Sequence, residues 1–289
     1  MGLSCAWRLS QQGLVVTLID AAATGHRTSG AAAGALKPFD ACQKGVKQKL
    51  QQQSLWQYPQ FVEELEDATG LQLHYTPCGR LQWLDTDRLQ ERAPQTTQQA
   101  NDTWPHADQP VQSILTGEAA TKLAPEMALP HTQVMHCRAS ASIDPRRTLD
   151  ALRMACAQNG VQIIEGIPVT PYAENGKISG VQTYNGDFWP AKNVLVTAGV
   201  WTMPLVERLC PQVKLRPIKK QAIELRLRTP LETRMLVDNR HVYLVPRGDG
   251  RSVYVGARTI KGAGWNDTPN LSDAQWLHKK AAEMMPQLA

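Results

Sequence analysis

The chain has 289 residues and a formal net charge of +5, from 31 lysines and arginines against 26 aspartates and glutamates. With 42% hydrophobic and 20% charged residues, its composition is that of a globular protein and excludes a disordered or fibrous one. The positive charge is small and contains no Lys/Arg block longer than a pair, which argues against a nucleic-acid partner. The apolar runs are too short to span a bilayer, so no membrane partner is expected.

The cysteines bear on the compartment and on metal binding. There are six, none in a CxxC pair, at positions 5, 42, 78, 137, 156 and 210. In a chain of this length, such scattered cysteines are typical of reduced, buried thiols in a cytoplasmic protein. We therefore expect neither a disulfide framework nor a metal site.

The first 20 residues predict a helix followed by a buried strand. Apolar residues at helical spacing begin at Leu3, and Gly13 is placed to end the helix. The apolar run 14–19 then predicts a strand in a parallel sheet that is covered on both faces. Residues 2–20 therefore look like the second half of a βαβ unit, and we expect its first strand to be missing.

The middle of the chain continues the alternation of helices and strands. The patterns predict helices over 46–69 and 144–160, and strands over 79–84, 161–165, 177–184 and 193–198. Residues 88–112 are rich in Gln, Thr, Asp and Pro, and we expect a partly helical surface excursion without a core of its own.

The pattern changes from residue 214 onward. Short strands over 221–227, 241–245 and 252–255, with turns such as Gly248-Asp249-Gly250, predict an antiparallel sheet, and a polar helix follows over 272–285. The expected fold class is α/β (α+β overall), a Rossmann-like βαβ domain interleaved with an antiparallel-sheet domain. The predicted domain bounds are 1–75 with 141–210, and 76–140 with 211–289.

Gly2 and Asp20 are spaced as in a dinucleotide-binding fold. In that fold a glycine-rich turn lets the backbone approach a pyrophosphate at a helix N-terminus, and an acidic side chain after the next strand binds the ribose. The motif's first two glycines are absent here, so any helix followed by a buried strand explains the same residues.

Two further stretches of small residues suggest ligand contact. The run 28–34 permits close backbone approach, and the hydroxyls of Thr28 and Ser29 can bind phosphate, although a flexible loop has the same composition. Ala198 and Gly199 follow a predicted strand, where ligands bind in open α/β sheets, but an ordinary strand-to-helix turn fits equally.

A polar strand face is the fourth candidate. On a strand, His241, Tyr243 and Val245 would share one face, with Val242 and Leu244 on the other. A face that carries His241 and Tyr243 can border a polar pocket. Arg247 lies just beyond, where its guanidinium can pair with a carboxylate. The alternative is a half-buried strand with its polar face in water. No nucleophilic triad, HExxH, Walker A motif or metal-ligand spacing occurs.

Together these segments resemble the FAD-dependent amino-acid oxidases of the D-amino-acid oxidase superfamily, most closely the glycine oxidases of thiamine biosynthesis. The segments occur in family order along essentially the whole chain, over 2–9, 29–36, 143–146, 196–201, 216–221, 243–247 and 255–257.

The resemblance implies FAD as cofactor, a small amino acid and oxygen as partners, and association into a homo-oligomer. It implies the following cofactor-binding residues: Gly2, Asp20, Ala21, Thr28, Ser29, Ala33, Gly34, Ala35, Val169, Ala198 and Gly199. It implies that His241 and Tyr243 border the amino-acid pocket, and it assigns no residue as a catalytic acid or base.

The activity implied is oxidative deamination of glycine or another small amino acid to an imino acid, with peroxide formed from oxygen, in the service of thiamine thiazole synthesis. One alternative is a related amine dehydrogenase that uses another acceptor. Another alternative is the flavin domain of a tRNA-modifying enzyme, but the absence of a basic face argues against it. The remaining alternative is a catalytically inactive remnant of the flavin fold.

Three departures from the family pattern accompany the resemblance. The first strand is absent, Lys220 replaces a usual glycine, and the chain stops before the segment that carries the carboxylate-binding arginine. Neither Arg247 nor Arg258 matches that position. We therefore expect a chain cut at both ends that binds FAD poorly, and a strand-restored version that binds it well.

Overall fold

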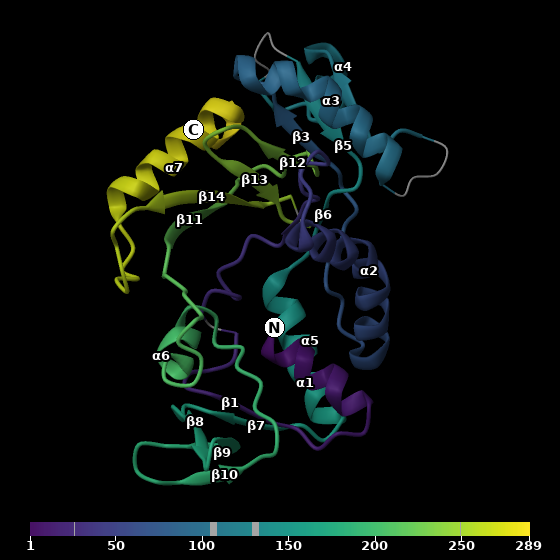
Figure 1. Ribbon diagram of the computed structural model, residues 1–289. Coiled ribbons are helices and arrows are strands. Elements are labelled where there is room, and N and C mark those ends of the chain that lie inside the picture. Colours follow the sequence, from purple (N-terminus) through teal and green to yellow (C-terminus); the bar gives the residue numbers. More distant parts are fainter. Residues whose placement is uncertain (26, 105–108, 129–132, 249) are drawn as a thin grey trace. The chain divides into compact units, whose positions relative to one another are not determined.

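The computed structural model describes residues 1–25, 27–104, 109–128, 133–248 and 250–289 (Figure 1). The chain divides into two compact units. Unit 1 comprises Met1–Ala32, Leu65–Leu71 and Pro145–Pro217, and unit 2 comprises Ala33–Glu64, Gln72–Asp144 and Ile218–Ala289. Residues 33–64 thus belong mainly with the antiparallel sheet, although the sequence grouped them with the βαβ domain. The functions of the two units stay a prediction.

Unit 1 is built on two helices and a parallel pair of strands. Helix α1 (Gly2–Gln11) packs against α5 (Pro145–Gln158) through buried apolar side chains, and the Cys156 thiol lies 3.4 Å from the Leu3 carbonyl oxygen. Strand β1 (Thr17–Asp20) pairs in parallel with β7 (Gln162–Glu165), so that Asp20 and Glu165 stand side by side where both strands end. The Rossmann-like element expected from the sequence is therefore present.

The same unit contains an antiparallel meander of β8 (Thr170–Glu174), β9 (Lys177–Gln182) and β10 (Phe188–Pro190). Asn175 and Gly176 both adopt positive φ angles, 51° and 75°, between β8 and β9. Two successive positive φ angles are the geometry of a tight hairpin turn, and Asn-Gly adopts it readily. The short elements η1 (Gly199–Trp201) and α6 (Thr202–Val206) follow.

Two strand predictions in unit 1 are wrong. The predicted strand 14–19 begins only at Thr17, and Val15 is fully exposed. The predicted strand 193–198 is not a strand, because no described strand runs beside it to satisfy its backbone. An apolar run of this kind becomes a strand only where such a neighbour is present.

Unit 2 is built on one seven-stranded sheet. Its strands, in spatial order, are β11 (Lys219–Arg226), β14 (Ser252–Ile260), β13 (Tyr243–Pro246), β12 (Leu236–Asp238), β3 (Arg80–Trp83), β5 (Val134–Cys137) and β4 (Gln112–Leu115). All neighbours are antiparallel except β12 and β3. The antiparallel sheet predicted for the C-terminal third is confirmed, whereas β4 and β5 were not predicted.

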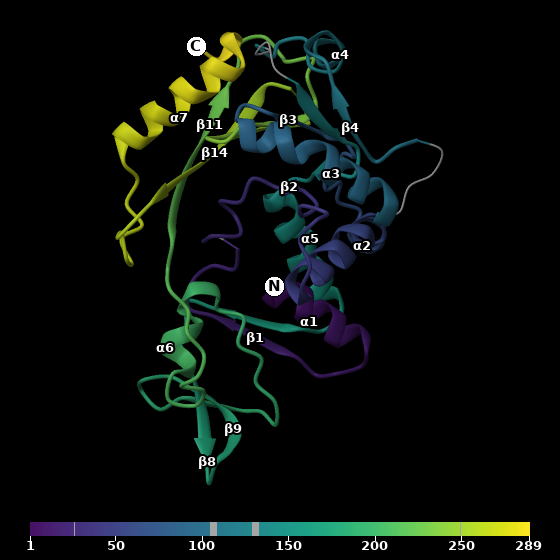
Figure 2. The same cartoon turned by 45° about the horizontal axis from the view of Figure 1, so that its top comes forward.

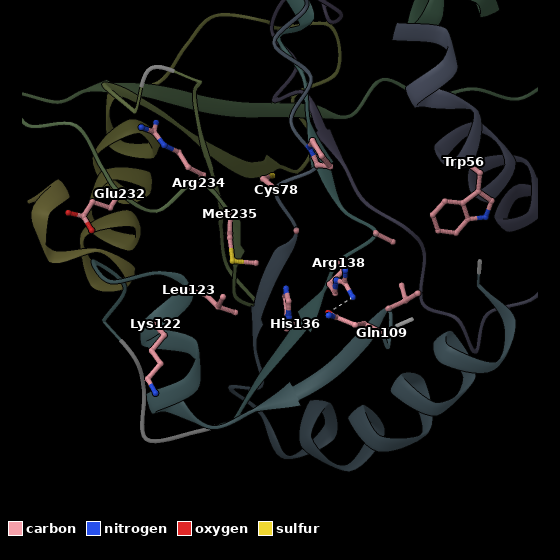
Figure 3. Close-up of a pocket in the computed structure, with 14 residues that line it drawn as sticks. Trp56, Cys78, Gln109, Lys122, Leu123, His136, Arg138, Glu232, Arg234 and Met235 are labelled. Atoms are coloured by element: carbon pink, nitrogen blue, oxygen red, sulfur yellow. Dashed lines mark hydrogen bonds between the residues drawn. The ribbon is translucent and has the colours of Figure 1, made fainter. Parts of the chain in front are cut away.

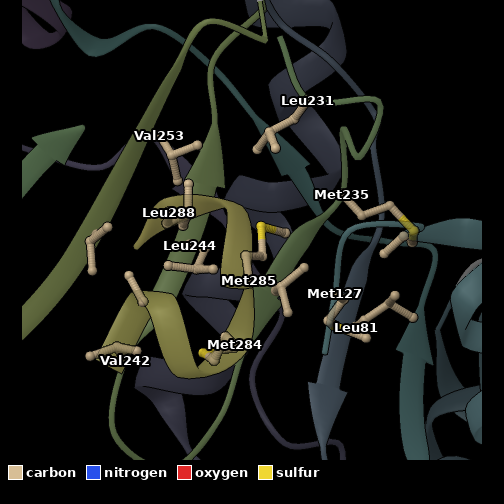
Figure 4. Close-up of a cluster of buried hydrophobic side chains, with 14 of the residues drawn as sticks. Leu81, Met127, Leu231, Met235, Val242, Leu244, Val253, Met284, Met285 and Leu288 are labelled. Carbon is tan, nitrogen blue, oxygen red and sulfur yellow. The ribbon is translucent and has the colours of Figure 1, made fainter. Parts of the chain in front are cut away.

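Helix α7 (Leu271–Met284) covers one face of this sheet (Figures 1 and 4). Leu244 and Val255 from the sheet, together with Leu277 and Met284 from the helix, are completely buried in one cluster. The short helix η2 (Pro286–Leu288) adds Leu288 to it. This cluster is the main core of unit 2.

A second cluster lies around helix α3 (Asp87–Thr103), beside the other end of the sheet (Figure 2). The sequence predicted no core here, but Ala100, Trp104, Val111 and Cys137 are buried together. The ring of Trp104 also meets that of Trp56 edge-on at 6.3 Å. The alanines of α3 let the helix lie close to the sheet, so a few aromatic residues suffice for a small core.

The remaining elements complete unit 2 and continue into unit 1. They are α2 (Val46–Thr69), which contributes to both units, α4 (Gly117–Leu123), and the short pair β2 (Ala35–Leu36) and β6 (Ala141–Ser142). The helix α2 has the bounds that the sequence predicted. All six cysteines are free, but only Cys137 and Cys156 are buried. No described helix is long and apolar enough to cross a membrane.

Candidate functional site

In unit 1 the start of α1 lies against the segment that precedes Gly199. A Cβ atom on Gly2 would stand 2.9 Å from the hydroxyl oxygen of Thr197, so a side chain there would collide with it. The helix begins after Met1 without a side-chain cap. The structure thus brings Gly2 beside Thr197-Ala198-Gly199, two of the stretches singled out in the sequence.

Asp20 and Ala21 lie at the carboxyl end of β1. Oδ1 of Asp20 accepts a hydrogen bond from the Ala22 N–H at 3.0 Å, while Oδ2 has no donor among the described residues. The backbone of Ile167, two residues before Val169, donates to the Asp20 carbonyl at 3.2 Å. Asp20, Ala21 and the segment that leads to Val169 are therefore neighbours.

The loop that follows Asp20 is held by one carboxylate. Glu165 accepts hydrogen bonds from the Thr24 N–H at 2.6 Å and from the Thr24 hydroxyl. The guanidinium of Arg153 donates to both carboxylate oxygens. The bonds from Arg153 and then those from Thr24 lower the pKa of Glu165 from 4.5 to about 2.

Thr28 and Ser29 are exposed in a turn that sits near Gly199. The guanidinium carbon of Arg27 lies 5.2 Å from the ring centre of Trp201, at the end of η1. His26, just before this turn, lies outside the described residues. The turn that carries the two hydroxyls therefore contacts the end of η1 through Arg27.

The other predicted residues lie in unit 2, and among them Tyr243 lies on the face of the sheet opposite α7. Strand register places Tyr243, Tyr254, Asp238 and Glu224 on one face, because Tyr243 pairs with Asp238 and Tyr254 pairs with Glu224. The rings of Tyr243 and Tyr254 stack at 6.1 Å with an interplanar angle of 19°. We call this surface of β11–β14–β13–β12 the Tyr243 face.

Charged groups surround the two rings. Asp238, 8% exposed, accepts from Arg80 Nε at 2.9 Å and from Lys37 Nζ at 3.1 Å. The Lys37 ammonium also lies 4.8 Å from the ring centre of Tyr243. Two cations therefore share one buried carboxylate beside the tyrosine that the sequence singled out.

Both tyrosine hydroxyls stay protonated near neutral pH. Burial raises the pKa of Tyr243, and it raises that of Tyr254 further, with the neighbouring Tyr243 adding to the effect. A neutral phenol keeps its proton for donation. The two hydroxyls also interact with each other, and the Tyr243 hydroxyl can donate to an acceptor such as a carboxylate.

His241 is not on the Tyr243 face, so the strand alternation expected there is wrong, whereas its role at the amino-acid pocket stays a prediction. The strand begins only at Tyr243, so the alternation of side chains does not extend back to His241. His241 is exposed in a turn held by the side chain of Asn239, and its ring meets Trp276 of α7 edge-on at 6.2 Å. It thus lies toward the helix that covers the opposite face.

The small residues Ala33, Gly34 and Ala35 lie against the Tyr243 face. Ala33 is buried with Val245 and Leu236, and Ala35 and Tyr243 pack onto the same cluster. Gly34 has a φ angle of +72°, which favours glycine, and its carbonyl accepts from the Ile143 N–H at 2.9 Å. The sequence analysis did not identify Asp238, Arg80 and Tyr254 as site residues. They come together only through the pairing of strands that are far apart in the sequence.

A separate groove opens elsewhere in unit 2 (Figure 3). It has a volume of about 840 Å³, and its lining includes His136, Arg138, Lys122, Glu232 and Arg234. Burial, with the Arg138 charge, lowers the pKa of His136. None of the predicted site residues lines this groove.

Residues 1–289, the whole chain, match the family described as "FAD dependent oxidoreductase". The chain belongs to this family. Its members are enzymes that use FAD as cofactor, so the FAD and the oxidoreductase class that the resemblance implied are confirmed.

Curated relatives of this oxidoreductase include glycine oxidases. The chain is 27% identical over 292 residues to the glycine oxidase of Pseudomonas putida, covering 100% of this chain and 76% of that protein. It is 27% identical over 312 residues to the bifunctional protein ThiO/ThiG of Synechocystis, covering 100% of this chain and 41% of that protein. The chain thus spans less than half of that bifunctional relative.

Solved structures share the fold. The glycine oxidase of Geobacillus kaustophilus superposes with a TM-score of 0.88 at 20% identity, over 99% of this chain and 76% of that one. The iminodiacetate oxidase of Chelativorans gives a TM-score of 0.85 at 21% identity, over 99% of this chain and 76% of that one. The predicted fold class is confirmed by these neighbours.

The residues of unit 1 fit an FAD group. The uncapped start of α1 suits a phosphate, and the absence of a side chain at Gly2 keeps the approach open. Oδ2 of Asp20, which has no donor among the residues that the structure describes, can accept hydrogen bonds from ribose hydroxyls. The donor and acceptor set is therefore the one that a dinucleotide needs.

Proposed function

We propose that this oxidoreductase oxidises glycine or another small amino acid to an imino acid, with oxygen as the final acceptor and peroxide as the second product. The observation that carries the proposal is the Tyr243 face, where two protonated tyrosines lie beside the small residues Ala33–Ala35. The glycine oxidases and the iminodiacetate oxidase among the relatives support the same substrate class.

In this proposal, some residues bind FAD and others position the amino-acid substrate. Asp20 and the start of α1 hold the two ends of the ADP part, and Thr28, Ser29, Val169, Ala198 and Gly199 line it. In unit 2, Ala33, Gly34 and Ala35 admit the flavin, and the Tyr243 hydroxyl donates to the substrate carboxylate. Bound at these residues, FAD would supply the acceptor for the two electrons of the amino acid, with oxygen as its reoxidant. Water then hydrolyses the released imino acid.

The wider role is part of the proposal. The ThiO/ThiG relative supports thiamine thiazole synthesis as the purpose of the reaction. The six free cysteines support a cytoplasmic location. Self-association, which the family resemblance implies, stays a prediction that sedimentation velocity can check.

The first experiment is a titration of the purified chain with FAD, followed by absorbance, over a range that reaches weak affinities. We expect the Asp20→Asn variant to bind FAD at least tenfold more weakly than the wild-type chain. The matched control is Asp187→Asn, an exposed aspartate of the same unit, which should bind as the wild type does. Equal affinities for all three would contradict the assignment of Asp20.

The second experiment assays peroxide on glycine, sarcosine and D-alanine in the presence of saturating FAD. We expect peroxide, and a KM for the amino acid that rises at least tenfold in Tyr243→Phe but not in Tyr184→Phe, whose ring is fully exposed. Reduction of a dye without peroxide would replace the oxidase by a dehydrogenase. No oxidation of any of the three substrates would overturn the proposal.

A further inference from the structure

The segment Ala33–Lys37 is fastened to the Tyr243 face at both of its ends. At its start, Nη1 of Arg247 donates to the carbonyl oxygen of Ala33 at 2.8 Å. At its end, Nζ of Lys37 pairs with Oδ2 of Asp238 at 3.1 Å. The two contacts come from side chains that neither the substrate role of Tyr243 nor the FAD assignment uses.

The Arg247 guanidinium is held in place by its surroundings. Arg247 follows β13 directly, and its side chain is 19% exposed. Its guanidinium carbon lies 5.4 Å from the ring centre of Tyr254, and Nη2 lies 4.0 Å from a carboxylate oxygen of Glu224. A planar guanidinium can stack on an aromatic ring and still direct an N–H at a carbonyl, which the compact ammonium of a lysine does poorly.

The Lys37 contact is fixed in a comparable way. Its ammonium lies over the Tyr243 ring at 4.8 Å, and its partner Asp238 is itself held by Arg80. Removing one cation from this group leaves the buried carboxylate with a single partner, which is costly for a charge in a poorly hydrated place. The end of the segment is therefore tied to the same tyrosine that faces the substrate in the proposed function.

We propose that Arg247 and Lys37 are positioning residues that clamp the segment Ala33–Lys37 to the Tyr243 face and so preorganise it for FAD. The proposal rests on the proposed function, which assigns Ala33, Gly34 and Ala35 to the flavin. A segment that is already ordered loses less conformational entropy when the cofactor binds, and its affinity for the cofactor is correspondingly higher. The clamp also fixes the distance between the flavin-lining backbone and Tyr243.

The test compares four variants of the whole chain: Arg247→Met, Arg247→Lys, Lys37→Met and Arg258→Met. Arg258 is the matched control, because it lies on the same sheet and also makes an ion pair, with Asp273 at 2.9 Å, and a cation–ring contact, with Trp276 at 4.3 Å. Its partners belong to α7, so its loss perturbs the opposite side of the sheet.

Hydrogen exchange of the amides of residues 33–37 is measured first, without FAD. We expect at least tenfold faster exchange in Arg247→Met and Lys37→Met than in Arg258→Met. FAD titrations follow, with an expected tenfold or greater loss of affinity for the same two variants. Arg247→Lys should restore less than half of the exchange protection, because a lysine cannot keep both the ring contact and the carbonyl bond.

The two measurements separate failure of the clamp from failure of the proposed function. Exchange in Arg247→Met that equals the exchange in Arg258→Met would overturn the clamp, whether or not FAD binds. Faster exchange with unchanged FAD affinity would overturn the preorganising role. A wild-type chain that takes up no FAD would overturn the proposed function, and the exchange data alone would then decide whether the clamp exists.

Discussion

Glu165 is the residue whose charge most directly holds a loop of the candidate site. Its carboxylate accepts hydrogen bonds from Arg153 and Thr24, and these hydrogen bonds lower its pKa from 4.5 to about 2. Because the pKa is lowered by folding, the stabilisation is fully present above about pH 4.5 and is lost as the pH falls toward 2. The loop after β1 should therefore loosen in this acidic window.

We predict that Glu165→Gln lowers the free energy of unfolding by roughly 1.5–3 kcal/mol at pH 7, the range for hydrogen bonds to a charged group. The difference between variant and wild type should shrink below pH 4.5 and vanish near pH 2. Urea unfolding between pH 2 and 7 measures it, with the exposed Glu174→Gln as control. A difference that is the same at every pH would contradict the role of the charge.

Gly256 allows the two stacked tyrosines to lie where they do. A Cβ atom at Gly256 would stand 2.6 Å from the hydroxyl oxygen and from Cζ of the half-buried Tyr243. We predict that Gly256→Ala destabilises the chain by about 1–3 kcal/mol, the usual cost of overpacking. Near-ultraviolet circular dichroism should report the displaced rings. Gly248→Ala is the control, since its nearest atom, on His74, would be 3.8 Å away.

Single residues of the site were predictable only where a local pattern determines them. Alternation along one strand correctly placed Tyr243 and Val245 on a face separate from Leu244. Asp238 and Arg80 could not be found this way, because they are 158 positions apart and meet through the parallel pairing of β12 with β3. His241 failed for a related reason, since a turn, and not the strand, sets its direction.

At the scale of elements, Gln221 ties strand β11 to the start of α7. Its side chain accepts from the Asn270 N–H at 2.8 Å and donates to the Asn270 carbonyl at 2.7 Å. We predict that Gln221→Leu lowers stability by about 1–2 kcal/mol, because two bonds are lost but water can reach the exposed Asn270. Thermal unfolding of this variant and of Thr259→Ala, an exposed neighbour in the sheet, measures it. Equal midpoints for the two would contradict the bridging role.

Helices were predicted better than strands, and the reason is physical. The bounds of α2 and α5 follow from side-chain spacing and end signals within each helix, which the sequence displays locally. A strand exists only beside a partner, so the apolar run 193–198 was overpredicted and β4 and β5 were overlooked. The same limit applies to the extent of β1, where Leu14 and Val15 look like strand residues but are exposed.

At the scale of the whole molecule, each unit has buried apolar side chains of its own. Leu244 is completely buried under α7 in unit 2, and Leu152 is 4% exposed on α5 in unit 1. Truncation of a buried leucine to alanine costs about 2–5 kcal/mol, because the lost contacts leave a cavity. We therefore expect each such substitution to lower hydrogen-exchange protection first at the amides that surround the same core.

We predict that Leu244→Ala lowers the hydrogen-exchange protection of the sheet β11–β14–β13 by about 2–5 kcal/mol and changes that of α1 and α5 by less than about 1 kcal/mol. Leu152→Ala should produce the reverse pattern, so each variant is the control for the other. Two units that open separately would leave the Tyr243 face intact when unit 1 loosens. Equal losses of protection across both units in both variants would show instead that the chain unfolds as one cooperative body, and the residues of the two units would then be stabilised or lost together.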